Sequence, residues 1–170
     1  MPTPLASAMS REEIESLARR IRAKFKCTDL YFDIIRFVEY VLPSIDSSFC
    51  YEYVDSAYLP ANTYAFYDPH DNIMRISSDV YENAIKDIGR DRFTIAHEVG
   101  HYFLHRNNIA LARSKSSVPA YRNPEWQANV FASALLIPVD KTKFMTPEEI
   151  QVSCKVSYQA ACIASRRNWQ

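Results

Sequence analysis

The chain has 170 residues, with 20 lysine and arginine residues against 20 aspartate and glutamate residues, and only two glycines. This length fits one domain with a core of its own. Because proteins average about 7% glycine, two glycines exclude sites built from glycine-rich loops, such as phosphate-binding loops and the dinucleotide-binding fingerprint. A formal net charge of zero argues against a broad basic surface for nucleic acid, although it leaves room for a small local patch.

The sequence predicts neither a membrane span nor disulfide bonds. No stretch approaches the roughly 18 apolar residues that a spanning helix needs, and residues 1–9 lack the basic and then apolar pattern of a signal peptide. Cys27, Cys50, Cys154 and Cys162 show no C-x-x-C spacing, which in a reducing cytosol favours free thiols over a zinc knuckle. We therefore expect a soluble, cytoplasmic protein.

Two helices are predicted to follow a flexible tail at residues 1–9. Ser10 and Glu13 form a capping box, and apolar residues recur at helical spacing after it. A second helix is predicted over residues 30–42, with Pro43 as its end. Both helices are expected to be core scaffold.

Between residues 48 and 77, the pattern changes to alternating aromatic and β-branched residues around turn-rich segments. This alternation is typical of a small antiparallel sheet of about three strands. A short helix is predicted next, with Ser78 or Asp79 as its N-cap and Gly89 at its C-terminal end. A longer helix is predicted over residues 91–106.

Residues 107–122 show no periodicity and carry three basic residues but no acidic one. Such a segment is interpreted as a lid over a cleft, a docking strand for an acidic or extended substrate, or a solvated mobile loop. Asn123 and the proline after it begin a helix predicted over residues 124–137. A capping box at Thr146 and a further start at Ser157 predict two more helices near the C-terminus.

The helix predicted over residues 91–106 contains the pattern His-Glu-x-x-His. His97 and His101 lie four residues apart on one helix face, so both imidazoles can reach one metal ion. Glu98 is rotated by about 100° from His97, which places its carboxylate beside the metal as a base for water held there. Composition alone produces this pattern in roughly half a per cent of such chains, so we predict a metal centre rather than a coincidence.

A third protein ligand is expected, because hydrolytic zinc sites use three protein ligands and one open position. The metzincin pattern is excluded, because Leu104 and Asn107 stand where it requires glycine and histidine. We predict Glu125, in the first turn of the next helix, as the third ligand; the small side chain of Ala128 lets the two helices approach. Asn129 can hydrogen-bond the far ring nitrogen of a ligating histidine. The alternative for Glu125 is a glutamate that only stabilises the helix N-terminus, and the alternative for Asn129 is an ordinary amide on the helix surface.

Other polar residues are weaker candidates for the site. His105 is rotated by about 80° from His97 and is expected to anchor the helix end rather than bind metal. A glycine inside a helix costs about 0.5–1 kcal/mol relative to alanine, so Gly100 is interpreted as room for a close neighbour, the sheet or a substrate backbone. The group that stabilises the developing oxyanion is left open among Tyr121, Arg122, Tyr102 and His70.

Two blocks of the sequence resemble the ImmA/IrrE family of metallopeptidases. They are R-F-T-x-A-H-E-x-G-H-x-x-L-H at residues 92–105 and E-x-x-A-N-x-F-A-x-x-L-L-I-P at residues 125–138. A looser likeness continues to Arg166, where family members carry a short helical segment similar to a winged-helix or helix-turn-helix element. Ile137 stands where methionine is common and Val99 where leucine is common, and both departures leave the chemistry intact.

The resemblance implies a gluzincin-like domain of the α+β class. We expect a mostly helical metallopeptidase domain at residues 10–138 with the small antiparallel sheet, followed by a helix-turn-helix-like segment at residues 139–170. The expected metal is zinc, with manganese as the alternative. It is held by His97, His101 and Glu125, with Asn129 behind them and Glu98 as the base of peptide hydrolysis. None of these residues is at a position where the sequence departs from the family pattern.

Family members cleave helix-turn-helix repressors inside bacteria, or on mobile elements and phages, and so derepress stress-response or element-transfer genes. The resemblance therefore implies an XRE-type repressor as substrate. Lys155, Arg166 and Arg167 are the basic cluster of the C-terminal segment, and DNA binding there is expected to be weak or absent. Two alternatives remain: a regulatory binding module with a structural metal, and a toxin–antitoxin effector that acts through a helix-turn-helix partner.

Overall fold

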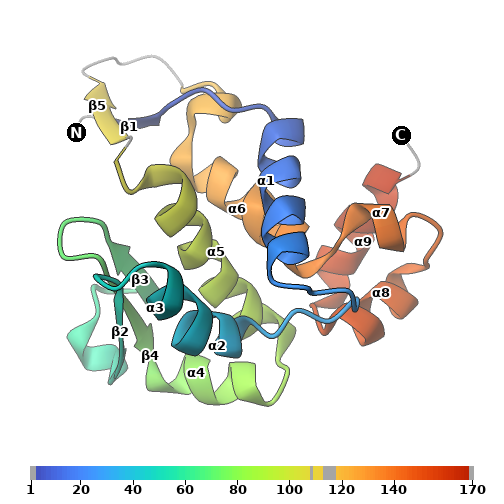
Figure 1. Cartoon of the computed structure of the whole chain (residues 1–170), viewed down its shortest axis with the longest axis horizontal. Helices are drawn as coiled ribbons and strands as arrows, with labels where there is room; N and C mark the ends of the chain where they lie inside the picture. The colour runs from blue at the N-terminus through green and yellow to red at the C-terminus, as the bar shows by residue number, and fades with distance from the viewer. Residues whose placement is uncertain (1–2, 108, 113–117, 169–170) are drawn as a thin grey trace.

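Two packed helices, α5 (Gly89–His105) and α6 (Pro124–Leu136), form the centre of the molecule. The computed structural model describes residues 3–107, 109–112 and 118–168. In it, α5 has a three-stranded sheet on one side and α6 with α1 (Arg11–Lys24) on the other (Figure 1). The predicted α+β class with mostly helical content is confirmed.

Local capping chemistry sets the ends of several helices, as predicted. The Ser10 side chain accepts a hydrogen bond from the Glu13 N–H, and the Glu13 carboxylate accepts one from the Ser10 N–H. Thr146 and Glu149 form the same reciprocal pair at the start of α8 (Pro147–Cys154). The Asn123 side chain caps α6. The C-terminal region also contains η3 (Ala120–Arg122), α7 (Val139–Thr142) and α9 (Tyr158–Asn168).

The helix predicted over residues 30–42 is irregular, and both of its predicted ends are wrong. Asp33 caps its start, and the chain continues past Pro43. It comprises α2 (Ile34–Arg36), the π-helical turn η1 (Phe37–Val41) and α3 (Leu42–Ile45). In the π-helical turn, the Leu42 N–H donates to the Phe37 carbonyl. This widened turn accommodates the proline ring that would clash with a regular preceding turn.

Three strands form a mixed sheet in the order β2-β4-β3. They are β2 (Cys50–Val54), β3 (Ala65–Asp68) and β4 (Ile73–Ser77). β3 and β4 are antiparallel, whereas β2 runs parallel to β4. The segment between β2 and β3 contains η2 (Ser56–Tyr58). The prediction of three strands is confirmed, but purely antiparallel pairing is wrong, because alternation identifies strands without identifying their neighbours. β3 lies at the edge of this sheet and contacts α5.

A second, two-stranded sheet joins β1 (Thr3–Ala6) to β5 (Ile109–Ala112). The prediction of a flexible tail is therefore wrong for residues 3–6, and Ala6 is buried. β5 also lies within residues 107–122, which the sequence predicted as an irregular loop. Two basic residues of the 107–122 segment, Arg113 and Lys115, lie outside the described residues, so its interpretation as a lid or a docking strand stays untested.

The start of α5 brings the chain unusually close to another segment. α4 (Ser78–Ile85) is capped by Ser77, not by Ser78 or Asp79. The left-handed residue after it is Asp87, with φ of 61°, so Gly89 does not end this helix as predicted. A Cβ on Gly89 would lie 2.3 Å from the Val156 carbonyl carbon in the α8–α9 connection. Glycine here provides room for a neighbouring backbone.

Replacing Gly89 by alanine should lower the free energy of unfolding by about 1–3 kcal/mol, because the connection must shift to admit the methyl group. Urea denaturation of Gly89→Ala measures the loss, and Glu82→Ala on the exposed face of α4 is the matched control. Equal stability of the two variants would contradict this close packing.

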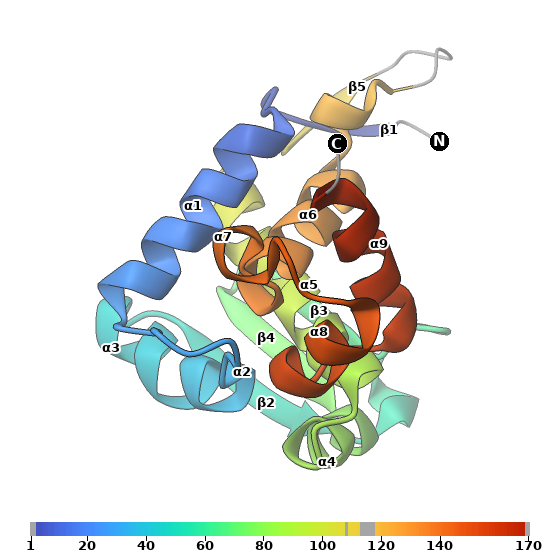
Figure 2. The same ribbon diagram turned by 90° about the vertical axis from the view of Figure 1, so that its right-hand side faces the viewer.

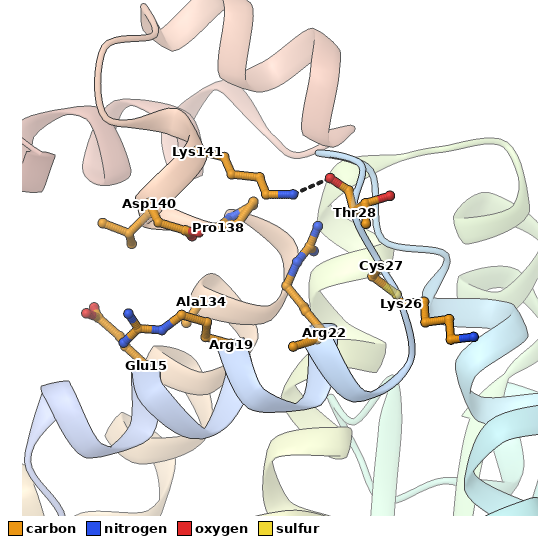
Figure 3. A pocket seen from close by; sticks show the side chains of 12 residues that line it. Glu15, Arg19, Arg22, Lys26, Cys27, Thr28, Ala134, Pro138, Asp140 and Lys141 are labelled. Carbon is orange, nitrogen blue, oxygen red and sulfur yellow. Dashed lines mark hydrogen bonds between the residues drawn. The ribbon is translucent and has the colours of Figure 1, made fainter.

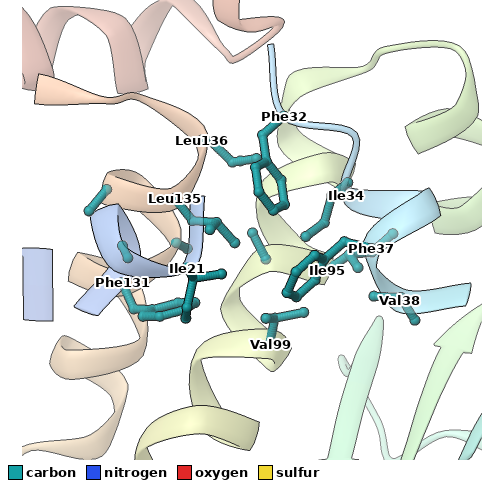
Figure 4. Packing of buried hydrophobic residues seen from close by; sticks show 14 of the residues in the cluster. Ile21, Phe32, Ile34, Phe37, Val38, Ile95, Val99, Phe131, Leu135 and Leu136 are labelled. Atoms are coloured by element: carbon teal, nitrogen blue, oxygen red, sulfur yellow. The ribbon is translucent and has the colours of Figure 1, made fainter. Parts of the chain in front are cut away.

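The core lies where α1, α2, η1, α5 and α6 meet, and it is filled by aliphatic and aromatic side chains such as Phe32, Ile95 and Leu135 (Figure 4). Fully buried Arg92 donates hydrogen bonds to the Phe32 carbonyl at 2.8 Å and the Lys155 carbonyl at 3.0 Å. It thereby joins α5 to the C-terminal segment at the α8–α9 connection.

The C-terminal helices belong to the same core. α7, α8 and α9 gather on one side of α5 and α6 (Figure 2). Cys154, Val156, Ala161 and Ala164 are all buried in the main hydrophobic cluster. The four cysteines are free thiols, as expected. Among the described helices, none is long and apolar enough to cross a membrane.

Candidate metal centre

The structure brings the three predicted metal ligands together. His97 and His101 project from successive turns of α5, and their Nε2 atoms lie 2.9 Å apart. Glu125 enters from the first turn of α6, with Oε2 3.2 Å from the Nε2 atom of His97 and Oε1 3.4 Å from that of His101. Four donor atoms on two helices therefore converge on one point.

This convergence fits a single ion. Ligand atoms at 2.0–2.2 Å from a tetrahedral ion lie roughly 3.3–3.6 Å from one another, and the separations found here are 2.9, 3.2 and 3.4 Å. Two imidazoles and one carboxylate are also a donor set of hydrolytic zinc sites. The residues present thus match a three-ligand metal centre in both spacing and chemistry.

The pKa shifts of Glu125 and His97 reflect attraction between the carboxylate and the imidazole rings. Hydrogen bonds from His101 and His97 hold the pKa of Glu125 well below its usual range. Burial lowers the pKa of His97, but the hydrogen bond to Glu125 and the charge of Glu98 outweigh it, so that this pKa is raised. Without a metal, therefore, Glu125 is an ionised carboxylate that faces the two rings.

Asn129 lies behind His97, as the sequence predicted. Its Oδ1 atom is 2.9 Å from His97 Nδ1. An amide oxygen only accepts hydrogen bonds, so the Nδ1–H of His97 donates to it. Nε2 of His97, which faces Glu125, is then the ring nitrogen left for a metal.

His105 lies behind His101 rather than among the metal ligands. Its Nδ1 atom is 2.9 Å from His101 Nδ1, and its Nε2 atom is 2.8 Å from Gln127 Oε1. The ring is only 3% exposed, and burial lowers the pKa of His105 to about 4. Sequence reasoning missed Gln127; its only signal is a polar residue within an otherwise apolar face of α6.

Glu98 lies next to the donor atoms but has a different partner. Its Oε2 atom accepts a hydrogen bond of 2.8 Å from the Tyr67 N–H, in the edge strand β3. Glu98 is 8% exposed, and burial raises its pKa. A carboxyl group with a raised pKa is suited to take up a proton and return it.

A cavity of about 390 Å³ contains this constellation. One wall is formed by Ala65, Phe66 and Tyr67 of β3, and the opposite wall by the histidines and Glu125. The candidates for oxyanion stabilisation do not line it: these are Tyr102, His70, Tyr121 and Arg122. Tyr102, for example, donates its hydroxyl to Asp46 instead.

Gly100 allows α5 and α6 to approach closely at the centre. A Cβ on this glycine would lie 3.1 Å from the Cα of Ala128 and 3.3 Å from a ring carbon of Phe131. The predicted close neighbour exists, but it is α6, not the sheet or a substrate backbone. The predicted role of Ala128 in helix approach is consistent with this contact. The approach places Glu125 and Asn129 within reach of the histidines.

The sequence pattern of the IrrE N-terminal-like domain of the M78 peptidases matches residues 58–165. The chain belongs to this family. The matched region contains all five residues of the proposed centre and continues beyond residue 138 into the C-terminal helices. This M78 peptidase is therefore a metal-dependent peptidase, a hydrolase of peptide bonds. No curated protein is similar enough to the chain to count as a match.

Another cavity of the M78 peptidase, of about 430 Å³, lies between α1 and the start of α7 (Figure 3). Two of its basic side chains hold backbone carbonyls: Arg22 donates to Leu135 at 2.6 Å, and Lys141 donates to Thr28. None of the predicted site residues lines this cavity. These contacts tie the α1–α2 connection to α6 and α7.

Proposed function

We propose that the chain is a zinc endopeptidase in which His97, His101 and Glu125 hold the ion and Glu98 is the general base. The observation that carries this proposal is the convergence of the three ligands, 2.9–3.4 Å apart, beside a buried carboxyl group in one cavity. The ion, when bound, would polarise the scissile carbonyl and the attacking water. Glu98 takes the water proton and later delivers it to the leaving amine. Manganese is the alternative ion, and metal analysis of the purified protein distinguishes the two.

The wall of the cavity supports a polypeptide substrate. β3 is paired with β4 on one side and lines the cavity with Ala65, Phe66 and Tyr67. An extended segment can add to such an edge through main-chain hydrogen bonds. In this arrangement the scissile bond lies between the edge strand and the metal ligands.

An XRE-type helix-turn-helix repressor is the proposed substrate, and the cytoplasm the proposed location. Membership of the family and the resemblance of both sequence blocks support this assignment. Weak or absent DNA binding is part of the proposal. Arg167 lies 3.2 Å from Glu15, so one of the three basic side chains of the C-terminal cluster is paired internally, which leaves Lys155 and Arg166 as its exposed charges.

Incubation of the metal-loaded protein with the repressor encoded beside it tests this function. We expect cleavage at one bond, located by mass spectrometry, and no cleavage after chelation. Metal binding and tight association without cleavage would support the binding-module alternative instead. Growth arrest that requires the active protein would support the toxin–antitoxin alternative.

A groove beside the metal centre suggests which segment of a substrate is bound. It has a volume of about 600 Å³, lies between α5, α6 and α9, and includes Asn129, the partner of His97. Phe93, Trp126 and Ile163 give it apolar surface. Among its lining residues in the described part of the chain, Arg11, Arg90 and Arg167 are charged and none is acidic. Arg11 and Arg167 lie 3.8 and 3.2 Å from Glu15, whereas Arg90 has no ion pair within the described part of the chain, so the charge of Arg90 favours an acidic segment with an apolar side chain.

Reversing one of these charges should weaken substrate binding. Arg90→Glu is expected to raise KM for the repressor by about 3–10-fold with little change in kcat, because reversal loses an exposed pair worth roughly 0.2–1 kcal/mol and adds a repulsion of similar size. Steady-state kinetics at low and high salt measure the effect, which should shrink as salt rises. Lys86→Glu, exposed and outside the groove, is the control. An equal KM for both variants would contradict recognition by the groove.

A further inference from the structure

We propose that His105 and Gln127 are positioning residues that fix which nitrogen of His101 faces the metal. The inference rests on the proposed metal ligands. It concerns side chains that are not among the proposed ligands: His105 borders the cavity behind His101, and Gln127 lies behind His105. Their effect is carried by a chain of hydrogen bonds that begins at two backbone carbonyls and ends at the ring of His101.

The orientation of Gln127 is determined by its surroundings. Its Nε2 atom lies 2.8 Å from the Ser7 carbonyl and 2.8 Å from the Tyr121 carbonyl. Carbonyl oxygens only accept hydrogen bonds, so the amide NH₂ group must face both of them. Gln127 is 1% exposed, and its Oε1 atom is therefore directed at His105.

The protonation of each ring then follows step by step. Gln127 Oε1 can only accept, so the Nε2 atom of His105 carries the hydrogen of their 2.8 Å bond. A neutral imidazole has one N–H, which leaves His105 Nδ1 as an acceptor. The 2.9 Å contact between the two Nδ1 atoms must then use the hydrogen of His101. Nε2 of His101, which faces His97 and Glu125, is consequently the ring nitrogen left for a metal.

The two ligating histidines are oriented by different means. His97 is held by Asn129, an exposed amide that water can replace. His101 is held by side chains that are 3% and 1% exposed, so water has little access to take their place. The chain of bonds also reaches Ser7, next to β1, and Tyr121 in η3. We infer that packing of the N-terminal strand contributes to the order of the metal centre.

Long-range ¹⁵N–¹H NMR of the metal-free, full-length protein tests the proposed tautomers directly. The chain has only four histidines, and single His→Gln variants assign their rings. We expect His101 to be protonated at Nδ1 and His105 at Nε2. A His101 ring protonated at Nε2 alone would overturn the proposal. Because no metal is needed, this result is independent of whether the proposed zinc function holds.

Metal affinity tests the consequence. Gln127→Met and His105→Phe should weaken Co²⁺ and Zn²⁺ binding by about 10–100-fold, as is usual for residues that orient a ligand. His105→Asn places an amide oxygen where Nδ1 was, so it should bind metal more tightly than His105→Phe. Asn129→Ala, the exposed counterpart, should lose less affinity than Gln127→Met. Circular dichroism verifies the fold of each variant, and wild-type affinity in a folded Gln127→Met protein would overturn the proposal.

Discussion

Replacing Glu98 by glutamine should abolish peptide hydrolysis while leaving metal binding and the fold intact. Glutamine has the shape of glutamate, and its amide oxygen can still accept the 2.8 Å hydrogen bond from Tyr67. What is lost is proton transfer, which contributes about 10²–10⁴-fold to the rate. The three proposed ligands are unchanged. Glu98 lies beside them, with a carboxylate oxygen within 4.8 Å of the ring nitrogens of His97 and His101, and its Oε2 atom is held by the Tyr67 N–H.

Three measurements on purified Glu98→Gln separate these effects: the rate of repressor cleavage, the metal content and the melting temperature. Only the rate should differ from the wild type. Glu12→Gln, on the exposed surface of α1, is the matched control and should retain full activity. A Glu98→Gln rate within a few-fold of the wild type would assign the general base to another residue.

The parts of the fold that were predictable from the sequence depend on local chemistry. The caps at Ser10, Asn123 and Thr146 use side chains within three residues of the helix start, and all three are confirmed. The errors have other causes. Pro43 continues a helix because a π-helical turn directly precedes it, and residues 3–6 form a strand because the distant segment β5 pairs with them. Neither the widened turn nor the pairing of β1 with β5 is visible in the spacing of apolar residues.

The same distinction applies to the metal centre. The histidine pair, Glu98 and the helix that supplies Glu125 follow from spacing along two helices, and the structure places them in one cavity. The hydrogen bonds behind His101 could not be predicted. Gln127 is held by the carbonyl of Ser7, 120 residues away in the chain, and only the packed fold brings the two together.

Replacing Glu125 by glutamine or alanine should remove tight metal binding with little cost in stability. The Glu125 side chain is 66% exposed, and the start of α6 keeps its Asn123 cap and its proline. The substitution leaves two imidazoles with Nε2 atoms 2.9 Å apart and no anionic ligand to offset the charge of the ion. We expect the affinity for Zn²⁺ to fall by roughly 100-fold or more. Residues that only orient a ligand typically contribute about 10–100-fold, and loss of a ligand itself should cost at least as much.

Competition with a chromophoric chelator measures this affinity in the wild type, Glu125→Gln and Glu98→Gln. The two glutamate variants should both be inactive for different reasons. Glu98→Gln should hold metal like the wild type, whereas Glu125→Gln should be metal-free at low ion concentration and recover part of its activity when zinc is added in excess. Wild-type affinity in Glu125→Gln would mean that the third ligand is another residue, because two neutral imidazoles alone do not hold a hydrolytic zinc ion tightly.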